Sequence, residues 1–480
     1  MGRSGVTRLG VGRRAFGATA AAAFCALAVV LVGFAQSARA EEDACSRVET
    51  DPETAWAYSV GLQAYVYGYP LVDLAVQMRN ETRRISPTQP IAAPVNAFAV
   101  YPHRLTPSTQ GALRAPNSDT IYFSGWIDLG AGPVVLRLPD AAGRYYTIAL
   151  TDMFGRPTHV GLRTTGSAAR DVVLVREGAP VASGEQRVVV SMRSRYVWAL
   201  GRMYVADEAD EARAIDLARK FRIDAPVPPA GPVTEGPRAE RPAGLEWFAT
   251  LNRALKDVSI QPEERAFITQ LDQIGLGPAS SFDAARLSTA ARAGLVCAAQ
   301  VGGGVIDKVG WRPTSATNGW MLNSRIGDPG SDYLLRASVA RGGYVNAPEE
   351  AIYPAAVRDR DGAALTGANT YEIVFPKGQL PPVDAFWSLT PYAAPGFTLT
   401  DNPIRRYAIG DRTKGLKFDK DGALRIVLSA ANPGRAASNW LPIPPGPFVL
   451  VARLYMPRKE ALDGRYALPP IVRVTSSAAQ

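Results

Sequence analysis

Residues 121–152 read IYFSGWIDLGAGPVVLRLPDAAGRYYTIALTD and contain three apolar or alternating runs. The runs are Ile121–Asp128, Pro133–Leu138 and Tyr145–Asp152, and they are separated by Gly-Ala-Gly-Pro and Asp-Ala-Ala-Gly. Short apolar runs bounded by Gly, Pro and Asp are typical of β-strands joined by tight turns. This stretch therefore predicts a β-rich domain.

Three further runs of the same kind follow, at Val172–Val175, Arg187–Met192 and Tyr196–Val205. Six short strands at this spacing predict an antiparallel sandwich or barrel. The last third of the chain returns to strand patterns, at Tyr371–Phe375, Ala385–Tyr392, Leu424–Leu428 and Phe448–Met456. No internal repeat relates the two strand-rich regions.

Helical patterns lie before and between these regions. Asp51 and Pro52 predict the start of a helix, as N-cap and first residue. Gly68-Tyr69-Pro70 is expected to end it, with a second short helix over Leu71–Met78. Further helices are predicted over Asp207–Phe221, Leu245–Lys256, Pro262–Ile274 and Phe282–Gln300. Pro226–Gly244 is rich in proline and predicts an extended linker, and Gly302-Gly303-Gly304 predicts a C-cap and loop.

The order of strands, helices and strands favours an α+β fold over a parallel α/β fold. We expect two antiparallel β-sandwich-like modules joined by a helical segment. The predicted parts are a leader over 1–40, an N-terminal β-rich domain with leading helices over 52–205, a helical and Pro-rich connecting region over 206–330, and a C-terminal β-rich domain over 331–480.

The leader has the three parts of an export signal. Arg13-Arg14 is followed by Phe16, Ala18–Phe34 is apolar, and Ser37–Ala40 supplies small residues for cleavage. The arginine pair predicts a signal peptide of the twin-arginine type and a periplasmic or secreted protein. The alternative is a permanent anchor, but an Ala-rich stretch of about 17 residues is at the short limit for a span. No later segment is expected to cross a membrane.

Charge and cysteine content exclude several classes of protein. The formal charge is +9, and five arginines without an acid lie in residues 1–40, which leaves 9 − 5 = +4 after cleavage. This gives no electrostatic basis for a nucleic-acid partner. Cys45 and Cys297 remain, and they either form a disulfide in an oxidising compartment or stay as two thiols. Their spacing excludes a cysteine-built zinc or iron–sulfur site.

Several longer motifs resemble known families. Gly68-Tyr69-Pro70-Leu71-Val72, Asn117-Ser118-Asp119-Thr120-Ile121-Tyr122 and Gly143-Arg144-Tyr145-Tyr146 resemble the family called domain of unknown function 1254. The stretch from Pro376 to Ser388, with Asp401–Ile404, Ile409–Arg412 and Asn439–Pro442, resembles the family numbered 1214. The resemblance implies β-sandwich-containing modules. It implies no reaction, substrate or cofactor, so the cofactor is unknown at this point.

In the N-terminal module, polar side chains gather at predicted strand ends. Asp119 and Asp152 are candidate catalytic acids or bases, and the candidate ligand-binding residues are Asn117, Tyr122, Tyr145 and Tyr146. Asn117-Ser118-Asp119 is equally typical of an Asx turn. Tyr145 and Tyr146 alternate along a strand, so they should point to opposite faces.

The C-terminal module combines carboxylates, indoles and amides. Asp384 and Asp411 are candidate catalytic carboxylates, and the candidate ligand-binding residues are Trp387, Asn402, Arg406 and Trp440. Aromatic faces with a few directional polar groups are typical of carbohydrate or amphiphile sites. Two carboxylates about 5–10 Å apart would serve glycoside hydrolysis. Turn chemistry explains Asn402 and Asp411 equally well.

The chain has only two histidines, His103 and His159, so any His-based acid–base chemistry must use one of them. A two-His metal site would need the two to converge with a carboxylate, and no metal is predicted. The sequence leaves two functions open. One is a hydrolase acting on a carbohydrate or lipid-like envelope molecule, and the other is a non-enzymatic protein that binds a ligand or partner. The oligomeric state is unknown.

Overall fold

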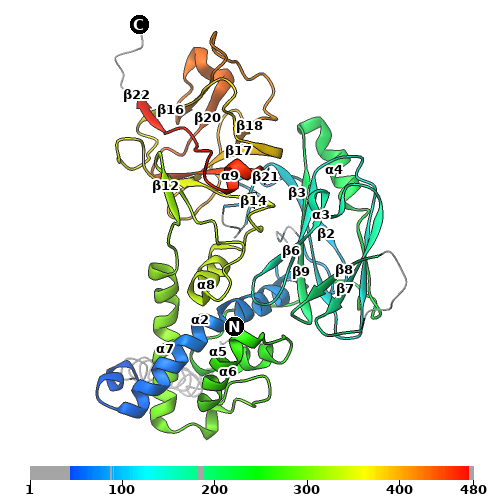
Figure 1. Cartoon of the computed structure of the whole chain (residues 1–480), viewed down its shortest axis with the longest axis vertical. Helices are drawn as coiled ribbons and strands as arrows, with labels where there is room; N and C mark the ends of the chain where they lie inside the picture. Colours follow the sequence, from blue (N-terminus) through cyan, green and yellow to red (C-terminus); the bar gives the residue numbers. More distant parts are fainter. Residues whose placement is uncertain are drawn as a thin grey trace, which may run out of the picture.

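The computed structural model describes residues 44–86, 89, 91–111, 113, 115–180 and 187–474, so the predicted leader over 1–40 lies outside the described residues. Within them, the chain forms two β modules and a helical layer (Figure 1). The predicted α+β fold with antiparallel sheet modules is confirmed.

The N-terminal module consists of two facing sheets. The five-stranded sheet has the order β2 (Ala99–Val100), β3 (Thr120–Asp128), β9 (Tyr196–Tyr204), β5 (Tyr146–Thr151) and β6 (Pro157–Gly161). The four-stranded sheet has the order β10 (Arg222–Asp224), β4 (Val134–Leu138), β7 (Arg170–Arg176) and β8 (Val188–Met192). Ile121, Phe123, Leu136 and Leu174 belong to the core between them. The pairing is antiparallel except between β7 and β8.

The C-terminal module repeats this two-sheet arrangement. The larger sheet has the order β12 (Ser315–Thr317), β13 (Trp320–Leu322), β15 (Ala355–Ala356), β21 (Phe448–Pro457), β17 (Val383–Ala393) and β18 (Ile409–Gly410), with β14 (Ala351–Ile352) also paired to β21. The smaller sheet has the order β20 (Trp440–Pro442), β19 (Leu424–Ser429), β16 (Thr370–Phe375) and β22 (Val472–Val474). Tyr371, Ile373 and Leu450 lie in the core of the C-terminal module.

The helical layer contains one helix that precedes the N-terminal module in the sequence and four that follow it (Figure 1). Its members are α2 (Pro52–Glu81), α5 (Gly244–Leu255), α6 (Arg265–Leu271), α7 (Thr289–Val309) and α8 (Tyr333–Gly342). The long helix α2 contacts the other four. The remaining short elements are helices α3 (Leu162–Thr165), α4 (Glu211–Ala218) and α9 (Lys459–Leu462), the 3-10 turns Arg47–Glu49, Glu208–Asp210, Pro262–Glu264, Asp272–Ile274, Ala284–Arg286 and Gly434–Asn439, and the parallel pair β1 (Arg83–Arg84) and β11 (Thr234–Glu235).

Pro70 does not end the first helix, so the prediction of two helices over 52–78 is wrong. The helix α2 runs through Pro70 to Glu81. Proline removes one N–H and crowds the preceding turn. In the structure, Nη2 of the buried Arg336 donates to the carbonyl of Tyr67, 3.2 Å away, just before the proline. Packing against α7, α8 and α5 holds the helix together across this position.

The triple glycine does not form a C-cap and loop, because α7 continues through it to Val309. A Cβ at Gly302 would lie 2.3 Å from Cδ1 of Tyr65 on α2. This glycine therefore allows close approach of two helices instead of ending one. The sequence patterns also did not reveal β6 or α8.

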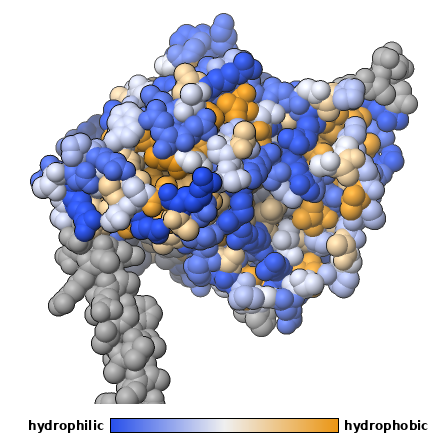
Figure 2. All heavy atoms as spheres, turned by 90° about the horizontal axis from the view of Figure 1, so that it is seen from below, coloured by the Kyte–Doolittle hydropathy of each residue, from blue (hydrophilic) through white to orange (hydrophobic). Residues whose placement is uncertain are grey.

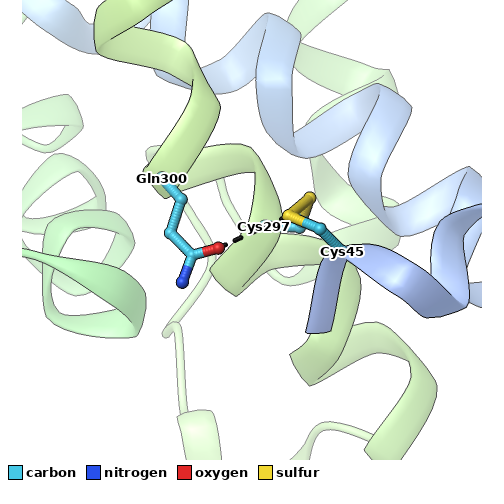
Figure 3. The surroundings of a disulfide bond; sticks show 3 residues. All are labelled: Cys45, Cys297 and Gln300. Atoms are coloured by element: carbon cyan, nitrogen blue, oxygen red, sulfur yellow. Dashed lines mark hydrogen bonds between the residues drawn. A yellow bond between two sulfur atoms is a disulfide. The ribbon is translucent and has the colours of Figure 1, made fainter. Parts of the chain in front are cut away.

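A disulfide ties the start of the described chain to the helical layer. Cys45 and Cys297 are bonded, with their Cα atoms 4.9 Å apart, and Oε1 of Gln300 lies 3.4 Å from Sγ of Cys45 (Figure 3). Of the two possibilities left open for these cysteines, the structure therefore contains the disulfide. The bond fixes the segment before α2 onto α7.

Among the described helices, α7 is long and apolar enough to span a membrane, although about a third of its most apolar window is buried within the protein. It also packs against α2, α5 and α8. One such helix is weak evidence for a span, and core helices of soluble proteins share its composition. Viewed from below, the molecule shows separate apolar patches among hydrophilic side chains (Figure 2).

Candidate functional site

A cavity of about 490 Å³ lies where the two β modules face each other. One wall is the five-stranded sheet, and the opposite wall comes from β21 in the C-terminal module. Strand alternation decides which residues reach the cavity. Even-numbered residues of β3 and β9 and odd-numbered residues of β21 face it, and their strand neighbours fill the sandwich cores. The wall residues are Tyr122, Ser124, Trp198, Leu200, Arg202, Val449, Val451, Arg453 and Tyr455.

The third side of the cavity is formed by α8 and the chain after it. Val339, Tyr344 and Tyr353 contribute side chains there. Leu113 and Trp311 also line the cavity, and they are 42% and 44% exposed. Large apolar side chains with this exposure mark the rim through which the cavity meets solvent. The volume is within the range of about 300–1,000 Å³ that is typical of small-molecule sites.

Two arginines lie in this apolar lining, one from each module. Arg202 on β9 is 8% exposed, and its Nη1 donates to Oδ1 of Asn346 at 3.0 Å. Arg453 on β21 is 3% exposed, and its Nη2 donates to the carbonyl of Ala115 at 2.7 Å and to the hydroxyl of Tyr392. Nη1 of Arg453 is buried without a hydrogen-bond partner among the described residues.

Tyrosine hydroxyls surround the two guanidinium groups. The hydroxyl of Tyr122 accepts from the backbone N–H of Asn117, and that of Tyr455 accepts from Nδ2 of Asn117 at 2.7 Å. Tyr353 accepts from Nδ2 of Asn346 at 2.9 Å. The guanidinium of Arg202 also lies 5.4 Å from the ring centre of Tyr122. The arginines and tyrosines thus form one polar cluster at the interface of the modules.

Glu81, at the end of α2, is the acidic residue in the cavity lining. Its carboxylate accepts from Nε2 of Gln77 at 2.7 Å and from the indole N–H of Trp126 at 2.9 Å. The indole of Trp198 donates to Oγ of Ser124, which lies 3.4 Å from the same carboxylate. Burial raises the pKa of Glu81, and these hydrogen bonds oppose the rise.

A second, polar cavity of about 750 Å³ opens between the modules on another side. It is lined by charges of both signs, including Arg104, Glu211, Arg405 and Lys414. Arg104 pairs with Glu211 at 2.8 Å and Lys414 pairs with Asp207 at 2.5 Å. Several of these charges therefore already compensate one another within the cleft.

The predicted turn at Asn117 is present. Oδ1 of Asn117 accepts from the backbone N–H groups of Asp119 and Thr120, both at 3.1 Å. Asn117 and Tyr122 also line the apolar cavity. Asp119 is fully buried and joins the modules, since it forms an ion pair with Arg412 and accepts from Oγ of Ser388 at 2.7 Å.

The four candidate catalytic carboxylates do not converge on a cavity. Asp411 lies near Asp119, and burial followed by the charge of Asp119 raises the pKa of Asp411 to about 6. Asp152 is buried and closes its own turn by accepting from the N–H groups of Phe154 and Arg156. Asp384 is 57% exposed and pairs with Arg458 at 2.7 Å. None of the four lines either of the two cavities above.

The remaining candidate ligand-binding residues mainly hold the fold together. Tyr145 and Tyr146 do point to opposite faces. The hydroxyl of Tyr145 donates to Glu350 of the C-terminal module at 2.7 Å, and Tyr146 fills the N-terminal core. The other four serve the C-terminal module: Trp387 and Trp440 are buried within it, Asn402 bonds to the backbone of Arg406, and Arg406 donates to the carbonyls of Ser438 and Trp440.

His159 is part of the contact between the modules. Its Nε2 accepts from the backbone N–H of Ala347 at 3.0 Å, and its Nδ1 lies 3.1 Å from Oγ1 of Thr147. Burial, followed by the charges of Arg202 and Arg163, lowers the pKa of His159 to about 3. His103 lies instead on the polar cleft. The described residues contain no group of three or more side chains suited to hold a metal ion.

Sequence reasoning missed Arg202, Arg453 and Glu81. A signal for the arginines was present, since each is the single charge within an otherwise apolar strand, YVWALGRMY in β9 and FVLVARLYMP in β21. A lone arginine in a strand with both faces covered has to be buried. Glu81 gave no such signal, because an acid at a helix end is common on surfaces.

Comparisons with known proteins agree with this architecture. The crystal structure of the VPA0106 protein from Vibrio parahaemolyticus has a TM-score of 0.64 and 24% identity, and the match covers 87% of this chain and 100% of that one. A putative uncharacterized protein from Burkholderia cenocepacia has a TM-score of 0.44 and 14% identity over 91% of this chain and 98% of its own. At 24% identity, the likeness to the Vibrio parahaemolyticus protein concerns the fold alone. A comparison with curated proteins finds no match.

Two family models match the sequence, and both are described as proteins of unknown function. The model called DUF1254 matches residues 95–225, which hold the N-terminal β module. The model called DUF1214 matches residues 350–459 in the C-terminal module. The chain therefore contains a region that matches the 1254 family, followed by a region that matches the 1214 family.

Proposed function

We propose that this protein binds a small lipid-like molecule in the cavity between its two β modules. The observation that carries the proposal is the cavity wall itself. Trp198, Leu200, Val449 and Val451 give an apolar surface from two facing sheets, and most of the lining is apolar. A concave apolar site with a few placed polar groups is the usual form of a small-molecule site.

We further propose that binding takes place outside the cytoplasm. The leader pattern with Arg13-Arg14 supports export. The disulfide between Cys45 and Cys297 adds support, since structural disulfides persist in oxidising compartments. In that location, envelope lipids and their breakdown products are available ligands.

The test is a fluorescence titration of the chain without its leader with Nile red, a neutral apolar dye. The wild type should bind the dye with increased and blue-shifted emission. Val451→Trp should weaken binding by about tenfold or more, because the indole occupies the cavity. Val451 is 7% exposed and lies on the wall formed by β21.

The matched control is Val189→Trp. Val189 is 40% exposed on β8 and does not line the cavity, so this variant should bind Nile red as the wild type does. Circular dichroism and thermal unfolding of both variants establish that each is folded. Equal dye binding by folded wild type and folded Val451→Trp would refute the proposed function.

A further inference from the structure

We propose that the ligand of this cavity carries an oxyanion head group, held by Arg202 from one module and Arg453 from the other. This inference rests on the proposed function, and it adds the chemical class of the ligand. The site would take a molecule with an apolar body and a single carboxylate, phosphate or sulfate.

The first argument is charge compensation. Several other buried or half-buried arginines have carboxylate partners: Arg193 and Arg336 share Glu264, Arg412 pairs with Asp119, Arg144 with Asp210 and Arg163 with Glu350. No carboxylate forms an ion pair with Arg202 or Arg453 among the described residues. A buried charge without a partner costs several kcal/mol. Two such cations beside one cavity indicate that the compensating anion is the ligand.

The second argument is the balance of donors and acceptors. Arginine can only donate hydrogen bonds, and each of these two has five N–H groups. The hydroxyls of Tyr122, Tyr353 and Tyr455 each accept a hydrogen bond from an asparagine, so their own O–H hydrogens remain to donate. This end of the cavity therefore offers guanidinium and phenol donors together. Such a set fits the several lone pairs of an oxyanion.

The third argument is the direction of the cavity. Asn117 bonds to the hydroxyls of both Tyr122 and Tyr455. Tyr122 lies opposite Arg202 in the sheet, with its ring centre 5.4 Å from that guanidinium, and Tyr455 lies two residues from Arg453 on the same face of β21, so the two cations lie around one point. Along β9, Leu200 and Trp198 lie on the same face, and Val451 and Val449 do so along β21. Four residues of strand span about 13 Å. Beyond them, Glu81 contacts Ser124, and its carboxyl group offers no positive charge to an anion. The head group therefore belongs at the arginine end, with the apolar body toward Trp198.

The experiment compares twelve-carbon probes that differ in their head group. Isothermal titration calorimetry at pH 8 measures dodecanoate, dodecyl phosphate, dodecanol and dodecylamine against the chain without its leader. Dodecanoate or dodecyl phosphate should bind at least about tenfold more tightly than dodecanol, and dodecylamine should bind most weakly. The comparison of carboxylate with phosphate identifies which oxyanion the site prefers.

Arg202→Met and Arg453→Met should each reduce the preference for the anion over dodecanol by about tenfold, while dodecanol binding changes little. If Arg453→Met does not fold, Arg453→Lys, which keeps the charge, is measured in its place. Arg213→Met is the control, because Arg213 is 70% exposed and outside the cavity. Equal binding of dodecanoate and dodecanol, or a preference that survives in the folded variants, would overturn the inference and leave the proposed function standing. Failure of all four probes together with Nile red would refute the proposed function.

Discussion

At the scale of single residues, the buried arginines of this protein fall into two groups. Arg412 neutralises Asp119 across the module interface, and removal of one partner would leave the other buried and charged. Among the residues that the structure describes, Arg202 has one hydrogen bond, to Asn346, and no ion pair. If its role is to hold a ligand, its charge stabilises the complex and not the unliganded fold.

This difference predicts that the same substitution has a much larger effect on stability at Arg412 than at Arg202. Arg412→Met should lower the free energy of unfolding by about 3–5 kcal/mol, because Asp119 loses its partner. Arg202→Met should lower it by less than about 1 kcal/mol or raise it, because a buried charge is removed and one hydrogen bond is lost. Urea unfolding of the unliganded variants measures both values. An equal loss in the two variants would mean that Arg202 serves the fold.

His159 predicts a dependence of stability on acid. Its pKa is lowered to about 3 in the folded protein and is near 6.5 in an unfolded chain. Between these values the unfolded state binds the extra proton, so stability is lost as the pH falls below about 6.5 and the loss is complete near pH 3. At pH 5 the contribution is about 2 kcal/mol.

The measurement is urea unfolding of wild type and His159→Gln at pH 7.5 and pH 5. The glutamine has no proton to take up in this range, and its amide oxygen can accept from the N–H of Ala347. The wild type should lose about 2 kcal/mol more than the variant between the two pH values. The same loss in both would show that His159 is not the group that titrates.

At the scale of elements, the three adjacent glycines of α7 have different surroundings. A Cβ at Gly302 would meet the ring of Tyr65 at 2.3 Å, whereas a Cβ at Gly304 would have no atom within 4 Å. Gly302→Ala should therefore destabilise the protein by about 1–3 kcal/mol through overpacking. Gly304→Ala should stabilise it by up to about 1 kcal/mol, because alanine is the better helix former.

Thermal unfolding of the two alanine variants checks this prediction, since both carry the same chemical change two residues apart. The midpoint should fall for Gly302→Ala and should not fall for Gly304→Ala. Equal shifts of the midpoint in both variants would mean that the close approach of α7 to α2 does not require a glycine at position 302.

Most of the longer strands were predictable, and the full lengths of α2 and α7 were not, for a physical reason. Alternating and apolar runs placed β3, β5, β9, β17 and β21 because a strand buries its side chains through local spacing alone. Pro70 and Gly302 were taken as ends of helices because both residues weaken an isolated helix. In the structure, Arg336 donates to the carbonyl of Tyr67 near Pro70, and the ring of Tyr65 packs against Gly302. Both partners are remote in sequence from the positions that they contact. Local propensity cannot contain such contacts.

At the scale of the whole molecule, the candidate site is made by the contact between modules. Asn117 bonds to Tyr455, and Arg202 bonds to Asn346, across separations of 338 and 144 residues. Asn117 and Tyr122, which the sequence placed near the start of a predicted strand, line the cavity. The sequence did not reveal that β21 lies opposite, since nothing local to β9 encodes which sheet faces it. The predicted sites therefore came from motifs, whereas the observed cavity comes from the assembly of both modules.

The bond between Cys45 and Cys297 turns more than half of the chain into a covalent ring. The ring contains the whole N-terminal β module and the exposed Pro-rich segment with Arg238, whose side chain is 59% exposed. A protease that cuts the backbone after Arg238 would produce two fragments that stay attached to each other. On a gel they would separate only after reduction, and the nicked protein would keep both halves of its cavity in place. On the proposal that the protein is exported, such tolerance of a single cut would prolong its function among extracellular proteases.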